Sequence, residues 1–194
     1  MNTQVKNFVW IRHAEKLYNN GKAAGRGKQH DPGIIDSQKT RLKIRSLIDK
    51  LVKSIGVPEK LITSPFLRTR QTTDMIVAYM KEKYGWTPKI EYSEDVSEYL
   101  GFCKNKNEEA DLEEETLAHM SNPFMIGESI DTLITRVEKH ILNIHKNESN
   151  IWVITHGIVM CKVFNFYNNF EPNRPEPLDY MVLGKNKLSA IFQS

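Results

Sequence analysis

Side chains that suit phosphate chemistry follow the short strand-like segments of this sequence. In chain order, four such segments are followed by Arg12 and His13, by Arg68, by Glu94, Asp95 and Glu98, and by His156. Arginine can bind phosphate oxygens through two parallel hydrogen bonds. A histidine nitrogen can act as a nucleophile, and a carboxylic acid can protonate a leaving oxygen. These residue types favour phosphoryl transfer, provided that the fold brings them together.

Strands that alternate with helices must position these residues, and this alternation is typical of an α/β fold. Short strand-like segments predict strands at residues 8–11, 60–63, 89–92 and 151–154, and those at 8–11 and 151–154 are apolar throughout. The carboxyl ends of parallel strands meet at one edge of a sheet, and open α/β sheets bind their ligands there. We therefore expect the residues that follow the strands to share one pocket.

Apolar residues at helical spacing predict three helices between the strands. One begins near Gln38, and another begins after Ser129, which can cap its first turn. A third is predicted to start with Ser64 as its cap and Pro65 as its first helical residue. It ends at Gly85. Arg136, in the helix after Ser129, is expected to form an ion pair on the helix face. His140 and His145 are expected to lie at the surface or in an interface.

The chain has 194 residues, a length that favours one domain. We expect a single domain over residues 1–194, with a cap or insertion at 101–126. That segment is irregular and contains a run of acidic residues. Near the end of the sequence, strand-like runs at 180–183 and 188–192 predict an edge hairpin.

The composition excludes several classes of protein. Hydrophobic residues make up 40% and charged residues 26%, as in ordinary globular domains. The two cysteines, Cys103 and Cys161, exclude a disulfide framework and favour a reducing compartment. The first eleven residues contain no signal-peptide pattern, and no apolar run is long enough to span a membrane. We therefore expect a cytoplasmic location.

The net charge of +3 conceals six acidic residues grouped between 108 and 115. The rest of the chain is more basic, which suits anionic partners. We expect a phosphorylated small molecule or phosphoprotein as substrate, and neither nucleic acid nor a membrane as partner. The oligomeric state is left open.

Four segments, in the same order, resemble the motifs of the histidine phosphatase superfamily, the phosphoglycerate mutase-like family. They are residues 11–19 with Arg12-His13-Ala14-Glu15, residues 63–72 with Ser64 and Arg68, Gly127-Glu128-Ser129 followed by Arg136, and residues 153–157 with His156-Gly157. The resemblance implies a three-layer α/β/α sandwich with a mostly parallel central sheet.

The resemblance also implies a role for each matched residue. His13 would be the nucleophile that becomes a phosphohistidine, and Glu98 would be the proton donor. The phosphoryl oxygens would be bound by Arg12, Asn19, Arg68 and His156. No metal and no cofactor would be needed, because these side chains supply the positive charge.

The sequence departs from the family pattern at three positions. Ala14 replaces a glycine after the nucleophile, and Lys16 replaces a small hydroxyl residue. Gly101 follows Glu98 one residue sooner than in the family pattern, so Glu94 and Asp95 remain alternative acids.

Other phosphate-binding and catalytic patterns fail. A Walker A loop within residues 21–33 would need glycine at Lys22 and serine or threonine at Gln29. Neither cysteine has the spacing to an arginine that cysteine phosphatases require, and no serine hydrolase or zinc protease motif is present. Two function classes remain: an enzyme of phosphate esters, and a catalytically weak module that binds a phosphate ligand. Among enzymes, we expect a hydrolase rather than a phosphoglycerate mutase-type transferase, because the polar segment 101–126 should exclude water poorly.

Overall fold

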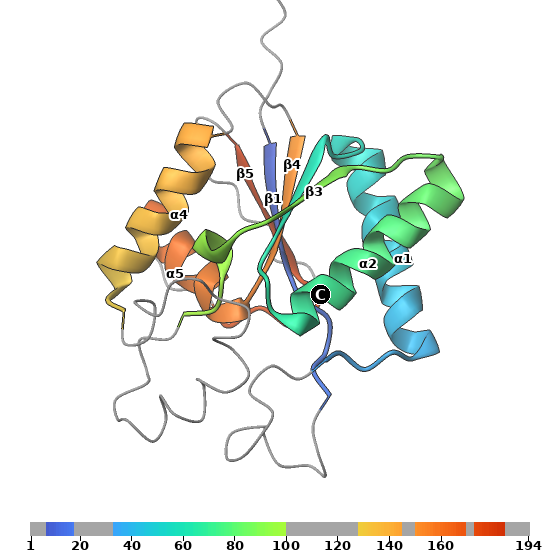
Figure 1. Cartoon of the computed structure of the whole chain (residues 1–194), viewed down its shortest axis with the longest axis horizontal. Helices are drawn as coiled ribbons and strands as arrows, with labels where there is room; N and C mark the ends of the chain where they lie inside the picture. The colour runs from blue at the N-terminus through green and yellow to red at the C-terminus, as the bar shows by residue number, and fades with distance from the viewer. Residues whose placement is uncertain (1–6, 18–32, 100–127, 145–149, 170–172, 185–194) are drawn as a thin grey trace, which may run out of the picture.

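The computed structural model describes residues 7–17, 33–99, 128–144, 150–169 and 173–184 (Figure 1). Within them a five-stranded sheet has the order β3-β2-β4-β1-β5. The strands are β1 (Asn7–Arg12), β2 (Lys60–Thr63), β3 (Lys89–Tyr92), β4 (Asn150–Thr155) and β5 (Tyr180–Gly184). The first four are mutually parallel, and β5 pairs antiparallel with β1 at the edge.

Helices cover both faces of the sheet, which confirms the predicted three-layer α/β/α sandwich (Figure 1). The helices α1 (Gln38–Ile55) and α2 (Leu67–Tyr84) cover one face. The other face is covered by α4 (Ile130–Ile144) and α5 (Gly157–Asn168), with a short 3-10 helix, η1 (Glu94–Val96), beside them. Side chains alternate along β1, so Val9 and Ile11 belong to the core under α1 and α2, whereas Trp10 belongs to the core under α4 and α5.

Several helix ends agree with the sequence patterns. The backbone N–H of Thr132 donates to the Ser129 hydroxyl at 3.1 Å, so Ser129 caps α4 as predicted. Ser37 caps α1 in the same way through Thr40, also at 3.1 Å. Gly85 ends α2 in the left-handed conformation, with φ of 62°, which glycine adopts without steric cost.

The predicted start of α2 is wrong. The helix begins at Leu67, two residues later than expected, and Phe66 occupies the cap position without a side-chain hydrogen bond. Ser64 does not cap the helix, because its hydroxyl lies 2.8 Å from Nε2 of His156. The serine thus connects the end of β2 to the residue that follows β4.

Some predictions fall outside the described residues. These are the position of Asn19, the cap at 101–126, the second hairpin strand at 188–192, Cys103, His145 and the side chain of His140. The first strand of the predicted hairpin is present as the edge strand β5. In the part of the chain that is described, no helix is long and apolar enough to cross a membrane.

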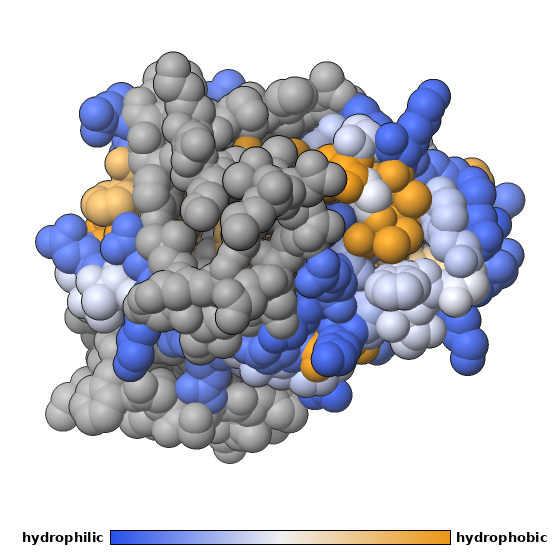
Figure 2. Space-filling view, turned by 90° about the horizontal axis from the view of Figure 1, so that it is seen from above, coloured by the Kyte–Doolittle hydropathy of each residue, from blue (hydrophilic) through white to orange (hydrophobic). Residues whose placement is uncertain are grey.

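The parallel strands begin at the top of Figure 1 and end at the bottom. Figure 2 views the molecule from the top, where the described surface is largely hydrophilic and hydrophobic side chains gather on the side of α1 and α2. The residues predicted to do chemistry follow the carboxyl ends of the strands and therefore lie at the opposite end of the sheet.

Candidate active site

His13 directly follows β1 and is held by backbone and side-chain contacts. Its backbone N–H donates to the carbonyl oxygen of Thr155 at 2.9 Å. Its Nδ1 lies 2.7 Å from the carbonyl oxygen of Ala14, so Nδ1 carries the proton and donates it. Burial lowers the pKa of His13 well below its usual value, and electrostatic interactions with His156 and Arg68 lower it further. His13 is therefore a neutral imidazole whose Nε2 keeps its lone pair.

The loop after His13 is fixed to α2. The backbone N–H of Ala14 donates to Oγ1 of Thr72 at 3.0 Å, and the Thr72 hydroxyl donates to the carbonyl oxygen of Arg68 at 2.7 Å. The methyl group of Ala14 lies in the apolar core under α1 and α2. Among the described residues other than glycine, only Asn169 and Leu178 have positive φ. The position of Ala14 therefore does not require glycine.

Arg68, Glu98 and His156 form a buried cluster beside His13. One carboxylate oxygen of Glu98, Oε2, lies 3.4 Å from a guanidinium nitrogen of Arg68 and 3.4 Å from Nδ1 of His156. The ring centroids of His13 and His156 are 5.3 Å apart. The structure thus brings together four of the residues that sequence analysis selected from four different segments.

Charges in this cluster are set by burial and by one another. Burial favours the neutral carboxyl of Glu98, but the interactions of the carboxylate with His156 and with the Arg68 charge outweigh burial and lower the pKa of Glu98. Burial lowers the pKa of His156 to about 4, although the Glu98 carboxylate opposes this shift. We assign the resting site an ionised Glu98 that is compensated by Arg68, and two neutral imidazoles.

Ser64 determines the orientation of the His156 ring. With Nδ1 of His156 facing the Glu98 carboxylate, the proton resides on Nδ1 and Nε2 accepts the hydrogen bond from the Ser64 hydroxyl. The ring edge of His156 also packs against Phe66, whose face is covered by the Arg68 guanidinium at 4.5 Å from the centroid.

Arg136 positions the loop that carries Glu98, which sequence analysis did not predict. Its guanidinium donates to both carboxylate oxygens of Glu128, at 2.9 and 2.6 Å. It also donates to the backbone carbonyl oxygens of Asp95 at 2.6 Å and Ser97 at 3.1 Å. The ion pair expected for Arg136 is present, with Glu128 just before α4 as its partner. The pair is buried, however, and the guanidinium also contacts the loop before Glu98. The sequence feature that could have indicated this role is the Gly127-Glu128-Ser129 motif followed by Arg136.

The three candidate acids occupy different positions. Glu94 and Asp95 lie in η1, and their carbonyl oxygens accept hydrogen bonds from Arg136. Glu98 follows η1, and its carboxylate is the one placed 3.4 Å from both Arg68 and His156.

Arg12 lies at the end of β1 beside the start of α5. Its guanidinium donates to the backbone carbonyl oxygen of Pro175. A side chain at Gly157 would place its Cβ 3.2 Å from Nε of Arg12 and 3.2 Å from Nε of Arg174. Because Gly157 has no side chain, both arginines can approach its backbone closely. No sequence motif indicated that Arg174 would be a neighbour of this site.

Lys16 is a further cation near this cluster. It is half-buried and forms a β-bridge with Ile34, so its backbone position is fixed. Burial lowers the pKa of Lys16, as do the charges of Arg68, Arg174 and Arg12, whereas Glu98 raises it. Lys16, which departs from the family motif, is therefore close enough to these residues for their charges to affect its pKa.

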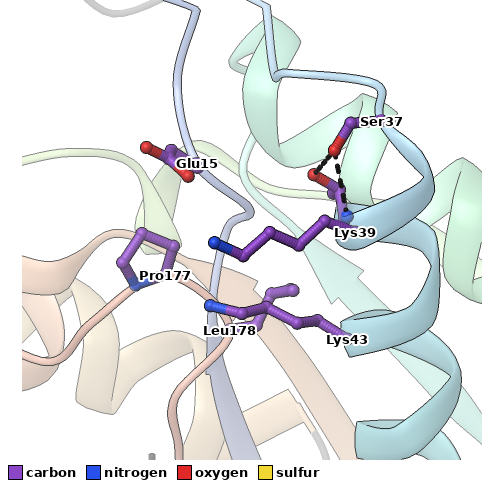
Figure 3. Close-up of a pocket in the computed structure, with 7 residues that line it drawn as sticks. Glu15, Ser37, Lys39, Lys43, Pro177 and Leu178 are labelled. Atoms are coloured by element: carbon purple, nitrogen blue, oxygen red, sulfur yellow. Dashed lines mark hydrogen bonds between the residues drawn. The ribbon is translucent and has the colours of Figure 1, made fainter.

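A separate pocket lies on the α1 side of the loop after β1 (Figure 3). Lys39 and Lys43 extend into it from α1, with Glu15 and Pro177 on its other side. Its lining includes none of His13, Arg68, Glu98 and His156, so this pocket is distinct from the candidate active site.

Comparison with known proteins agrees with this geometry. A sequence model of the histidine phosphatase superfamily (branch 1) matches residues 8–186. No curated protein sequence matches the chain.

Solved structures share the fold at low sequence identity. The mycobacterial glucosyl-3-phosphoglycerate phosphatase is 15% identical, with a TM-score of 0.63, and the match covers 98% of this chain and 100% of that one. Phosphoglycerate mutase from Bacillus anthracis is 14% identical, with a TM-score of 0.63 and coverage of 98% and 93%. The protein histidine phosphatase SixA in complex with tungstate is 10% identical, with a TM-score of 0.57 and coverage of 91% and 86%.

Proposed function

Since the chain belongs to the histidine phosphatase superfamily (branch 1), we propose that it hydrolyses phosphate monoesters through a phosphohistidine on His13. One observation carries this proposal. The Nδ1 proton of His13 is donated to the Ala14 carbonyl oxygen, so the lone pair stays on Nε2, and burial together with the electrostatic effects of His156 and Arg68 keeps the imidazole unprotonated. A neutral imidazole with a fixed tautomer is a nucleophile that needs no separate base.

In the first step, Nε2 of His13 attacks the phosphorus atom and forms a P–N bond. The bond to the leaving oxygen breaks, and its electron pair departs with that oxygen, which takes a proton from Glu98. Arg12, Arg68 and His156, with Asn19 as a further candidate, would stabilise the charge on the three equatorial oxygens.

The proton on Glu98 must come with the substrate. In the resting site the pKa of Glu98 is lowered, because the interactions of the carboxylate with His156 and Arg68 outweigh the effect of burial. A bound phosphate adds negative charge beside the carboxylate and neutralises Arg68, which raises the pKa of Glu98. A monoanionic ester carries one proton on its phosphate, and we propose that this proton moves to Glu98 before the leaving oxygen departs.

In the second step, the Glu98 carboxylate takes a proton from water, and the water oxygen attacks the phosphorus. The P–N bond breaks, its electron pair returns to Nε2 of His13, and inorganic phosphate leaves. Arginine and histidine side chains supply the positive charge in both steps, so we propose that the reaction does not require a metal ion.

The direct test is to incubate the protein with a 32P-labelled monoester and to stop the reaction with alkali. We expect a base-stable, acid-labile label on His13, and the His13→Ala variant should remain unlabelled and inactive. Release of inorganic phosphate should accompany labelling. Near-normal turnover by the His13→Ala variant would refute the proposal.

The same assay separates a hydrolase from a mutase. With phosphoglycerate as substrate, a hydrolase releases phosphate, whereas a mutase interconverts the 2- and 3-phosphate isomers with little release. Absence of both reactions, with tight phosphate binding, would indicate a binding module.

A further inference from the structure

Arg12 is held by the segment before β5 through three contacts. Its backbone N–H donates to the carbonyl oxygen of Asp179 at 2.9 Å, and its own carbonyl oxygen accepts from the N–H of Leu178 at 3.2 Å. Its guanidinium donates to the carbonyl oxygen of Pro175. Both the backbone and the side chain of this candidate phosphate-binding residue are therefore fixed by residues 175–179, which follow it by 163 positions or more.

The Asp179 side chain closes a tight turn in this segment. The backbone N–H of Asp179 donates to the carbonyl oxygen of Glu176 at 2.9 Å, and the N–H of Glu176 donates to Oδ2 of Asp179 at 2.7 Å. Asp179 is buried, and this burial raises the pKa of its carboxyl group, whereas the hydrogen bond from Glu176 and the charges of Arg12 and Lys43 lower it. A buried carboxylate is costly unless hydrogen bonds compensate it, and the Glu176 N–H provides one here.

The same turn holds an unfavourable backbone conformation. Pro177 and Leu178 are its central residues, and Leu178 has a φ of 71°. Glycine is favoured at such a position of a turn, because a Cβ adds steric cost there. A conformation of this kind persists only where the surrounding contacts fix it. Two such contacts are the burial of Leu178 in the core under α1 and α2 and the hydrogen bond from Glu176 to Asp179.

We propose that Asp179 is a positioning residue for Arg12: its carboxylate closes the turn, and the closed turn holds the Arg12 guanidinium where it can bind a phosphoryl group. This role rests on the proposed function, because phosphate binding by Arg12 belongs to that proposal. Without the hydrogen bond from Glu176, the turn can relax from its strained conformation. The Pro175 carbonyl oxygen then no longer fixes the guanidinium.

Isothermal titration calorimetry with inorganic phosphate tests this role without requiring turnover. The Asp179→Ala variant should bind phosphate about tenfold more weakly than the wild type, because a misplaced guanidinium loses a charge-assisted hydrogen bond. The Asp179→Asn variant keeps an oxygen that can accept from Glu176, so its Kd should stay within about threefold of the wild-type value. A Kd does not depend on the fraction of protein that is folded, so loss of folded protein alone would leave it unchanged.

A double-mutant cycle shows whether Asp179 acts through Arg12. In an Arg12→Gln background, the Asp179→Ala change should alter the phosphate Kd by less than about twofold, since the group that the turn positions is absent. An equal loss of affinity in both backgrounds would overturn the positioning role.

Asn150 provides the matched control at the other end of the sheet. Asn150 and Asp179 are both 8% exposed, and the Asn150 amide donates to the carbonyl oxygens of Gly56 and Val57 at 3.0 and 2.9 Å. The Asn150→Ala variant should therefore lower the Tm, as Asp179→Ala does, but leave the phosphate Kd unchanged. Equal weakening of phosphate binding by the two variants would contradict a specific role for Asp179.

A second variant removes the dependence on Asp179→Ala, should that protein not fold. Asp179→Glu keeps the charge but moves the carboxylate by one methylene, and it should also weaken phosphate binding. Wild-type affinity in both the Asp179→Ala and Asp179→Glu variants would overturn the role, as would an Asp179→Asn variant as weak as Asp179→Ala. Absence of phosphate binding by the wild type would remove the role of Arg12 and this inference with it.

Kinetics with two esters separates this role from that of the candidate acid. Arg12 would contact the phosphoryl oxygens and not the leaving group, so Asp179→Ala should lower kcat/KM by a similar factor for p-nitrophenyl phosphate and for an alkyl phosphate. A loss confined to the alkyl phosphate would overturn the action through Arg12. If neither ester is hydrolysed but the phosphate Kd depends on Asp179 through Arg12, the proposed function fails and the positioning role stands.

Discussion

Arg136 holds Glu128 with two hydrogen bonds, at 2.9 and 2.6 Å, and the same guanidinium donates to the backbone carbonyl oxygens of the loop before Glu98. Both side chains are buried. Removing one partner of a buried ion pair typically costs about 3–5 kcal/mol, because the other charge is left without compensation. Arg136 is therefore a positioning residue, which acts on the site through the loop that carries the candidate acid.

Replacing Arg136 with lysine should lower turnover in a way that depends on the leaving group. Lysine keeps the charge but loses the planar fork that contacts Glu128 and the loop together. We expect kcat for an alkyl phosphate to fall about tenfold or more. A misplaced general acid loses part of the roughly 10²–10⁴-fold rate enhancement that general acid catalysis contributes. The rate with p-nitrophenyl phosphate should fall much less.

Arg41→Lys is the control for this change. Arg41 donates to both carboxylate oxygens of Asp36, at 2.8 and 2.6 Å, but that pair is exposed on the surface. The control should retain both rates. An equal loss for both esters in the Arg136→Lys variant would contradict a role through the acid.

The Glu98→Gln variant should be impaired most with poor leaving groups. Glutamine cannot deliver a proton, so hydrolysis of an alkyl phosphate should slow by about 10²-fold or more. p-Nitrophenolate leaves without a proton, and its release should be less affected. Steady-state kinetics with a series of leaving groups checks this. If Glu94→Gln or Asp95→Asn shows this pattern and Glu98→Gln does not, the acid is misassigned.

The protein should lose stability as the pH falls from about 6.5 towards 5. His156 remains neutral in the folded protein until about pH 4, whereas in the unfolded chain it binds a proton near its ordinary value of 6.5. The unfolded state therefore binds more protons in this window, and the free energy of unfolding falls on acidification. Urea unfolding at pH 7 and pH 5 should show a loss of about 2 kcal/mol from this group. The His156→Gln variant should lose correspondingly less, and equal losses would show that His156 titrates normally.

The acidic limb of the pH profile should lie well below pH 6.5. Burial lowers the pKa of His13, so its Nε2 remains unprotonated in mildly acidic solution. p-Nitrophenolate leaves without a proton, so this substrate reports mainly on His13, and its kcat/KM should stay high from pH 7 down to about pH 5.5. A fall in kcat/KM with an apparent pKa near 6.5 would indicate that the nucleophile is a histidine with an ordinary pKa.

Chelation should leave activity intact, and vanadate should inhibit. The proposed charge stabilisation comes from Arg12, Arg68 and His156, so incubation with EDTA should change kcat by less than about twofold. Vanadate mimics five-coordinate phosphorus and should compete with substrate. Loss of activity on chelation, with recovery on addition of magnesium or zinc, would contradict the mechanism.

Much of the fold could be predicted from local patterns. The strands at 60–63 and 89–92 occupy the predicted positions, because short runs of strand-forming residues bounded by breakers are a local property of the chain. Gly85 and Ser129 mark helix ends for equally local reasons of backbone freedom and side-chain capping. The meeting of His13, Arg68 and His156 was also predictable, because parallel strands carry the residues that follow them to one edge of the sheet.

Contacts between distant segments were not predictable in this way. The Ser64 hydroxyl could cap a helix or bind another group, and only the adjacency of β2 and β4 places His156 within 2.8 Å of it. Arg136 likewise reaches the loop before Glu98 because α4 packs beside η1.

The sequence by itself determined the elements, the order of the motifs and the chemical types at the sheet edge. The tertiary structure decided that Glu98 is the acid that faces Arg68, and that Arg136 holds the loop before Glu98. It also decided that Arg174 approaches Arg12 at Gly157. The physical reason is that helix and strand signals arise from interactions between residues a few positions apart. Hydrogen bonds such as those of Ser64 and Arg136 depend instead on the strand order β3-β2-β4-β1-β5, which joins segments far apart in the chain.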